Sequence, residues 1–201
     1  MRNDHLSRRF FMGKTLLAGG SLMTTPLVSN ISITYSNQAM QKDDISLAQW
    51  ALVQEMREGK WKNLDFPRIA REDFGLNGIE FVNTLFEVPT VQYLNQLKQN
   101  ANDMDVTMVL IMVDAEGDGA ESTSALRKQF VINHQKWVDI AHYLGCHAIR
   151  TNCRGPENAD PDEALKWAVE SYHMLLDYAK ASGVQIVIEN HGGVSNDPDW
   201  M

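Results

Sequence analysis

The chain has 201 residues, enough for one well-buried domain, of which 44% are hydrophobic and 22% are charged. The formal net charge of −8 disfavours a nucleic-acid binder, because such proteins normally present a basic face. After residue 40 no stretch has the ~20 uninterrupted apolar residues that a membrane-spanning helix needs. We therefore expect a globular domain with no nucleic-acid partner and no membrane span in the mature protein.

Residues 1–39 differ from the rest of the chain. The arginine pair Arg8-Arg9 lies within SRRFF and is followed by a mildly apolar run that contains two glycines. This pattern resembles the twin-arginine export signal, which implies a leader read by the twin-arginine machinery and a periplasmic protein. A disordered basic tail is the alternative. Of the 18 basic and 26 acidic residues, four and one lie in the leader, which leaves residues 40–201 with a net charge of −11.

Five apolar runs follow the leader and predict β-strands. Their hydrophobic residues are nearly continuous rather than alternating, as expected for parallel strands that are covered on both faces. The predicted strands span residues 45–52, 78–83, 106–114, 147–152 and 184–190.

Helices are predicted between the strands, because apolar residues recur there at steps of three and four. The predicted helices span residues 65–74, 90–101, 124–144 and 162–181. In the last helix a single apolar stripe is formed by Leu165, Ala168, Val169, Tyr172, Leu175, Leu176 and Ala179. Asp160 is placed to cap this helix, and Gly75, Gly145 and Gly183 each fall where a helix should end in a left-handed residue.

The alternation of strands and helices predicts a parallel sheet with right-handed crossovers. Eight units of this spacing would take about 280 residues, close to the size of a (β/α)8 barrel. Five units fit either a self-sufficient open sheet or a barrel cut off after strand five. An open nucleotide-binding sheet would carry a glycine-rich loop after strand one, but VQEMREGKWKN follows QWAL here, which favours the barrel.

Polar residues stand at the carboxyl ends of the predicted strands, where functional groups collect in both architectures. In chain order they are Gln49 and Trp50, Glu80 and Asn83, Asp114, Arg150 and Asn152, and Glu189 and His191.

Glu189 is the most informative of these residues. It follows three apolar residues, and a carboxylate in that position is costly to bury without a partner. The partner is a divalent metal, Arg150 from the neighbouring strand, or water at an open rim. His191 has the same side-chain parity and would face the same cavity. The residues alone leave open whether Glu189 is a metal ligand or half of a buried ion pair.

The segment IVIENHGGVSNDPDW, with ISLAQWAL, GIEFVN and AIRTN upstream, resembles the xylose isomerase-like TIM-barrel superfamily, and more narrowly its sugar phosphate isomerase/epimerase group. The resemblance covers about residues 45–201 and implies an α/β fold, a (β/α)8 TIM barrel truncated after strand five. In that family a glutamate at the end of strand five binds Mn²⁺, Mg²⁺, Co²⁺ or Zn²⁺, and the matching residue is Glu189. The family's other ligands lie on strands six to eight, which we expect beyond residue 201.

The resemblance implies a metal-dependent sugar isomerase or epimerase, or a related lyase, that acts on a small carbohydrate. Glu189 would be both a metal ligand and the base that removes a proton next to a carbonyl. The residues expected to line the sugar pocket are His191, Asn152, Arg150, Glu80 and Trp50. A tryptophan that simply packs at the rim is the alternative for Trp50. We expect the present chain by itself to be inactive and to bind metal poorly.

Two other functions remain open at this point. A non-catalytic carbohydrate-binding barrel would keep the scaffold but lack the ligands of strands six to eight. An apurinic endonuclease, also related to this superfamily, is disfavoured by the export signal and by the charge of −11 on residues 40–201.

Overall fold

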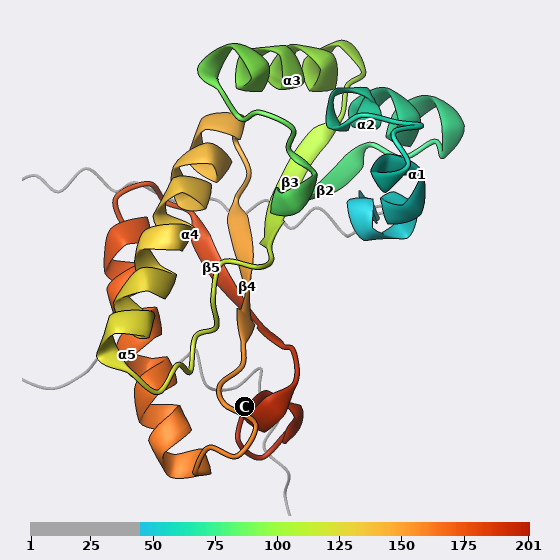
Figure 1. The fold of residues 1–201 in the computed structure, drawn as a ribbon. Helices are drawn as coiled ribbons and strands as arrows, with labels where there is room; N and C mark the ends of the chain where they lie inside the picture. Colours follow the sequence, from blue (N-terminus) through green and yellow to red (C-terminus); the bar gives the residue numbers. More distant parts are fainter. Residues whose placement is uncertain (1–44) are drawn as a thin grey trace, which may run out of the picture. The chain divides into compact units, whose positions relative to one another are not determined.

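The computed structural model describes residues 45–201, so the leader expected at residues 1–39 lies outside the described part of the chain. Five parallel strands form one sheet in the order β1-β2-β3-β4-β5 (Figure 1). They are β1 (Ser46–Ala48), β2 (Gly78–Val82), β3 (Thr107–Val113), β4 (Ala148–Cys153) and β5 (Gln185–Asn190). Strands consecutive in sequence are neighbours throughout, as in a (β/α)8 barrel. A doubly wound sheet would instead reverse its strand order at a switch point.

Helices connect the strands, as the sequence predicts. They are α1 (Val53–Arg57), α2 (Phe66–Arg68), α3 (Val91–Asp103), α4 (Ser124–Leu144) and α5 (Pro161–Ala179), and a π-helical segment (Ile69–Asp73) continues α2. Asp160 caps α5 by accepting the backbone N–H groups of Asp162 and Glu163, each at 3.1 Å. Gly145 and Gly183 follow α4 and α5 with φ of 85° and 70°, a left-handed conformation that glycine adopts without steric cost. None of the helices among residues 45–201 is long and apolar enough to cross a membrane.

The first strand is shorter than predicted. The expectation of a strand over residues 45–52 is wrong beyond Ala48, because a 3₁₀ helix (Gln49–Leu52) begins there. The side chain of Gln49 is buried, and its Oε1 accepts the backbone N–H of Val82 at 2.6 Å while its amide donates to Asn63. These bonds direct the chain away from β1 and give the backbone N–H of Val82, at the end of β2, a hydrogen-bond acceptor.

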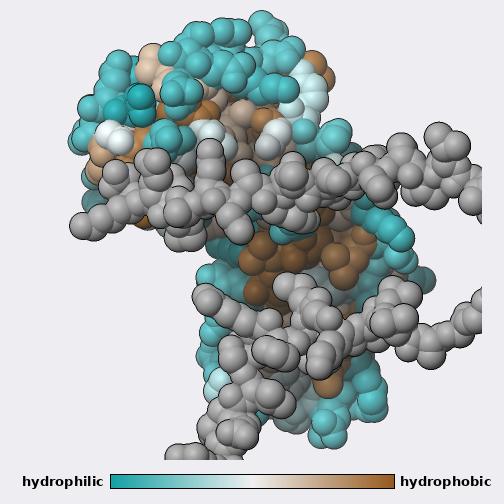
Figure 2. Space-filling view, turned by 180° about the vertical axis from the view of Figure 1, so that it is seen from behind, coloured by the Kyte–Doolittle hydropathy of each residue, from teal (hydrophilic) through white to brown (hydrophobic). Residues whose placement is uncertain are grey.

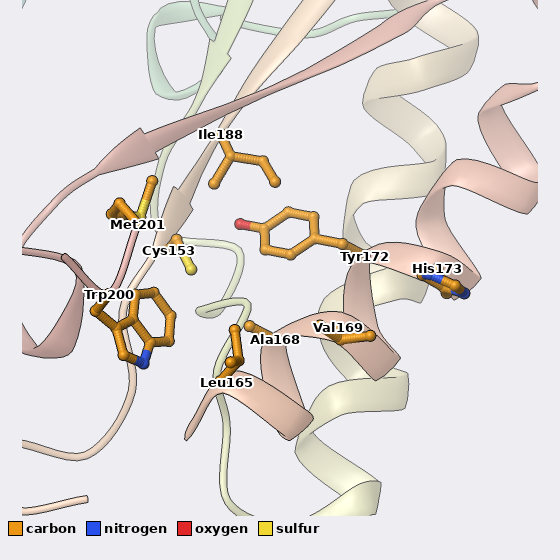
Figure 3. Close-up of a pocket in the computed structure, with 9 residues that line it drawn as sticks. All are labelled: Cys153, Leu165, Ala168, Val169, Tyr172, His173, Ile188, Trp200 and Met201. Carbon is orange, nitrogen blue, oxygen red and sulfur yellow. The ribbon is translucent and has the colours of Figure 1, made fainter. Parts of the chain in front are cut away.

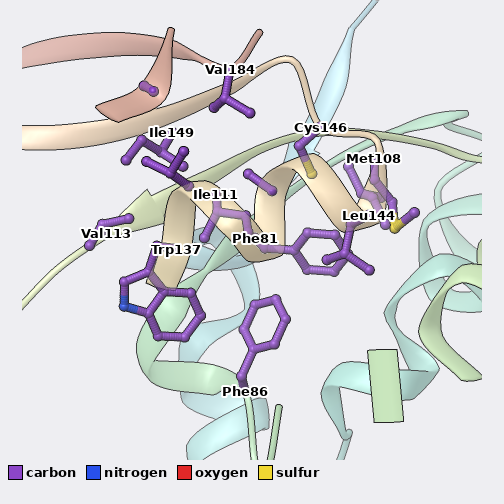
Figure 4. Packing of buried hydrophobic residues seen from close by; sticks show 14 of the residues in the cluster. Phe81, Phe86, Met108, Ile111, Val113, Trp137, Leu144, Cys146, Ile149 and Val184 are labelled. Carbon is purple, nitrogen blue, oxygen red and sulfur yellow. The ribbon is translucent and has the colours of Figure 1, made fainter. Parts of the chain in front are cut away.

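The side of the sheet that faces the helices holds the hydrophobic core. Phe81 and Ile111 from adjacent strands are fully buried, and Phe86 packs edge-on against Phe81 and Trp137, with ring centroids 5.4 and 5.5 Å apart (Figure 4). Edge-to-face pairs of this kind stabilise a core beyond the area that they bury. We call this side the helix face.

The opposite side of the sheet carries the side chains of alternate parity, and we call it the inner face. Glu80, Leu110, Arg150 and Val187 stand at its positions, one on each of the last four strands. Seen from behind, the described part of the chain shows hydrophobic side chains gathered in the middle of the visible surface, with hydrophilic ones around them (Figure 2). Val187, an apolar residue of the inner face, is 41% exposed.

Candidate functional site

Three polar side chains meet at the carboxyl ends of β3 and β4. The guanidinium of Arg150 donates to Asp114 Oδ1 at 2.8 Å and also to the side-chain oxygen of Asn152. The Asn152 amide donates to the same Asp114 oxygen at 2.9 Å. Arg150 and Asn152 are two residues apart in β4, so both point to the inner face. The three groups therefore form a closed, mostly buried hydrogen-bonded triangle.

Glu189 and His191 extend this group to the end of β5. Glu189 is paired with Asn152 in the register of β4 and β5. Its Oε2 lies 3.0 Å from Nε of Arg150 and 3.4 Å from Nδ1 of His191. The contact with Arg150 is an ion pair, because Oε2 accepts no aligned hydrogen bond within residues 45–201. The structure thus brings together Glu189, His191, Arg150 and Asn152.

Asp114 keeps its negative charge in this group. Burial by itself raises the pKa of the Asp114 carboxyl, but hydrogen bonds from Asn152 and Arg150 and the positive charge of Arg150 outweigh burial. The pKa therefore lies below its usual value of 3.8. Arg150 consequently stands between two carboxylates, Asp114 on one side and Glu189 on the other.

Glu80 and Trp50 are placed apart from this group. Glu80 lies on β2 and accepts a hydrogen bond from the hydroxyl of Ser46 on β1. Trp50 lies in the 3₁₀ helix after β1, and the guanidinium of Arg57 stands 5.4 Å from its ring centroid. No hydrogen bond or ion pair within residues 45–201 joins either side chain to the Arg150 group.

The donors that a metal ion needs are present only in part. In the described part of the chain no three His, Cys, Asp or Glu side chains lie close enough to hold a metal ion. Glu189 and His191 supply two donors, and the Glu189 oxygen without a hydrogen bond is of the type that hard divalent cations prefer. A protein site normally uses more ligands than two. Residues 45–201 therefore fit one side of a metal site and not a complete one.

A separate cavity of about 220 Å³ lies on the helix face, between α5 and β5 (Figure 3). Leu165, Val169 and Ile188 contribute to its walls, with Trp200 and Met201 of the C-terminal segment beside them. The prediction of a single apolar stripe on α5 is therefore only partly right, since Leu165 and Val169 remain half-exposed while Ala168 and Leu175 are buried. The cavity has a mostly apolar lining and lacks the converging carboxylates of the Arg150 group.

Asp114 is the residue of this site that sequence reasoning leaves out of the expected pocket. Its place at the end of the third predicted strand is visible in the sequence, as is the position of Arg150 on the next strand. What the sequence does not show is that both belong to one side of the sheet, because this depends on the register of β3 and β4, which pairs Met112 with Arg150. Asp114 lies two residues after Met112 and therefore has the same side-chain parity.

Comparison with known proteins assigns the fold. The family model for the xylose isomerase-like TIM barrel matches residues 68–199. A xylose isomerase domain containing protein from Salmonella typhimurium superposes with a TM-score of 0.56 at 17% identity, over 76% of this chain and 51% of the other. A 3-keto-D-glucoside 4-epimerase from E. coli gives 0.54 at 13% identity, over 63% and 50%. A D-psicose 3-epimerase from Clostridium cellulolyticum gives 0.52 at 18% identity, over 61% and 45%.

These identities are low, so the similarity to solved structures speaks for the fold alone. The chain spans about half the length of the three structures. A search of curated proteins found no match.

Proposed function

The chain belongs to the xylose isomerase-like TIM barrel family, and we propose that it forms strands one to five of a metal-dependent sugar isomerase or epimerase. Two of the similar solved structures are sugar epimerases, which supports this reaction class. The observation that carries the proposal is the carboxylate of Glu189. It lies at the carboxyl end of β5 beside Arg150 and His191, and its Oε2 accepts no hydrogen bond from the described residues.

Glu189 has two roles in the proposed reaction. Its carboxylate would hold the divalent cation (Mn²⁺, Mg²⁺, Co²⁺ or Zn²⁺) and take the proton from the carbon next to the substrate carbonyl, and a proton returned to the deprotonated substrate would complete the reaction. A cation held there would supply polarisation of that carbonyl. His191 is the second donor within this chain, and the remaining ligands come from residues beyond 201 in the full-length protein.

The substrate that we propose is an uncharged sugar or polyol. At the site Asp114 and Glu189 bring two carboxylates against the guanidinium of Arg150, and Glu80 adds a third carboxylate farther away on β2. A neutral polyol beside a divalent cation suits this charge balance better than a phosphorylated sugar. The proposed export of the protein to the periplasm agrees, since sugar phosphates are rarely available outside the cytoplasm.

Asn152 and Arg150 orient hydroxyl groups in this proposal, whereas Glu80 and Trp50 lie towards β1 and would contact the far end of a substrate. A second candidate is a barrel that binds carbohydrate without turning it over, which would lack the metal ligands of strands six to eight.

Deuterium exchange separates these functions. The full-length protein is incubated with Mn²⁺ and a panel of free aldoses, ketoses and keto-glucosides in D₂O, and each sugar is examined by NMR for deuterium next to its carbonyl. An isomerase or epimerase incorporates deuterium into at least one sugar, and a chelator abolishes the exchange. Sugar binding without exchange would establish the binding barrel. Cleavage of DNA at abasic sites without any sugar exchange would establish an endonuclease.

A further inference from the structure

Polar contacts join the carboxyl ends of four successive strands, β2 to β5. The first contact is between Asn83, which follows β2, and the backbone of Asp114, which follows β3. The Asn83 side chain accepts the N–H of Asp114 at 2.8 Å and donates to its carbonyl at 2.9 Å. Asn83 is itself buried. Two reciprocal bonds from a buried side chain fix both the position and the orientation of the Asp114 backbone.

The second contact passes from Asp114 to Arg150. Asp114 Oδ1 accepts from both Arg150 and Asn152, and Asn152 accepts from Arg150 in turn. The side chain of Arg150 is only 9% exposed. A planar guanidinium with two neighbouring acceptors in a buried place has little freedom to rotate. Arg150 is therefore held by Asp114 and Asn152, independently of Glu189.

The third contact passes from Arg150 to Glu189. Glu189 is 41% exposed, lies on the last strand of the sheet and receives no aligned hydrogen bond on Oε2 within residues 45–201. Its other close contact in the described chain is with Nδ1 of His191, which is also half-exposed. An exposed glutamate otherwise samples several rotamers, and ordering it costs conformational entropy. Within residues 45–201, the buried group that contacts the Glu189 carboxylate is Arg150.

We propose that Asp114 is a positioning residue, which holds Arg150 so that Arg150 fixes the Glu189 carboxylate at the mouth of the site. The proposal rests on the proposed function only in giving Glu189 a chemical role. Ligands and bases act well only when they are held close to their productive geometry. Residues that orient a metal ligand from behind typically change metal affinity by about 10- to 100-fold when they are removed.

The chain offers a matched control at a second arginine. Arg127 on α4 is also 9% exposed and is also bonded at 2.8 Å to a carboxylate, that of Glu170 on α5. The test compares Asp114→Ala with Glu170→Ala, because both variants deprive an equally buried arginine of an equally close partner. Asp114→Asn is the conservative variant, since its amide oxygen can still accept from Arg150 and Asn152.

The readout is the conformation of Glu189, which does not require activity. The side chain is followed in this chain by crystallography and by the carboxyl ¹³C resonance of Glu189. Asp114→Ala should shift and broaden this resonance and spread the carboxylate over several rotamers. Asp114→Asn should restore a single conformer, and Glu170→Ala should leave the resonance in place. If Asp114→Ala does not fold, Arg150→Lys replaces it, because one ammonium group cannot bridge both carboxylates.

Broadening of the same resonance by added Mn²⁺, measured in the full-length protein, is the second measurement. Asp114→Ala should need at least about 10-fold more Mn²⁺ than the parent full-length protein for equal broadening. Failure of Mn²⁺ to broaden the resonance in the parent full-length protein would count against the proposed function, and the rotamers of Glu189 would then test the positioning role by themselves. An unchanged Glu189 in Asp114→Ala, or an equal change in Glu170→Ala, would overturn the positioning role.

Discussion

The two sides of the sheet differ in what their side chains do. On the helix face Phe81, Ile111 and Ile149 are fully buried and pack against helices. On the inner face the alternate residues are a mixture of apolar groups and paired charges, with Arg150 and Glu189 among them. Because successive residues of a strand point to opposite sides of the sheet, each strand supplies core residues to the helix face and polar residues to the inner face. The helix face therefore accounts for the fold, and the carboxyl end of the inner face carries the groups suited to chemistry.

The largest expected effect is on the helix face. Phe81→Ala removes a fully buried ring that packs against Phe66 and Phe86, and it should lower the free energy of unfolding by about 3–5 kcal/mol. Val187→Ala, on the inner face, removes a 41% exposed side chain and should cost less than about 1 kcal/mol. Urea denaturation of both variants measures the difference. Equal costs would mean that the two faces do not differ in packing.

A slightly smaller effect is expected from the buried charges of the inner face. Arg150→Met leaves Asp114 without its cation and should cost about 3 kcal/mol of unfolding free energy. Asp114→Leu should cost a similar amount, whereas the double variant should be more stable than the sum of the two single costs predicts, by about 1 kcal/mol or more. A double-mutant cycle in urea gives this coupling. Additive costs would show that the two side chains act independently.

The cap at the start of α5, which lies away from both faces of the sheet, should contribute less to the free energy of unfolding. Asp160→Ala removes the side chain that accepts two backbone N–H groups at the start of α5 and should cost about 1 kcal/mol. Glu157→Ala, three residues earlier in the exposed loop, is the control and should cost almost nothing. Thermal unfolding of the two variants measures the difference in stability. If Asp160→Ala were as stable as Glu157→Ala, the stability of α5 would come from its packing and not from its cap.

The smallest effect should appear only on acidification. His134, on α4, is fully buried, and burial lowers the pKa of its imidazole below the usual 6.5. Its Nδ1 donates to the carbonyl of Phe130 at 2.8 Å in the neutral form. The unfolded chain then binds more protons than the folded one below pH ~6.5, so stability falls as the pH falls.

Unfolding free energy measured between pH 7 and pH 5 tests this dependence. His134→Gln should reduce the slope against pH, and the exposed His173→Gln should leave it unchanged. An unchanged slope in His134→Gln would mean that His134 does not titrate differently in the two states.

Most of the fold follows from local pattern. The apolar runs predict all five strands, and the periodicity over residues 124–144 predicts α4 to the residue. The predicted end of the first strand is wrong because Gln49 leaves the strand to form hydrogen bonds with Val82, 33 residues away, and with Asn63. A local pattern contains no information about such a partner. The exposed part of the α5 stripe has a similar origin, since periodicity shows which residues are apolar and not which of them find a neighbour.

The site is predictable in its location but not in its connections. The carboxyl-end rule places Glu189, Arg150 and Asn152 near one another, and the structure joins them. Glu80 instead pairs with Ser46, and Asp114 takes the central place that no motif marks. Contacts between strands depend on register, and the pairing of Met112 with Arg150 is not readable from residue types.

The central claim is that Glu189 serves chemistry and not stability, and Glu189→Gln in the full-length protein tests it most directly. The amide is a weaker metal ligand and cannot act as a base, while its half-exposed position makes little difference to folding. The measurement is the Mn²⁺-dependent rate of deuterium exchange into sugar, taken beside the unfolding midpoint, with Glu170→Gln as the control. We expect the exchange rate of Glu189→Gln to fall by at least about 100-fold at an unchanged midpoint. A near-normal exchange rate would contradict the account and reduce Glu189 to an ion-pair partner of Arg150.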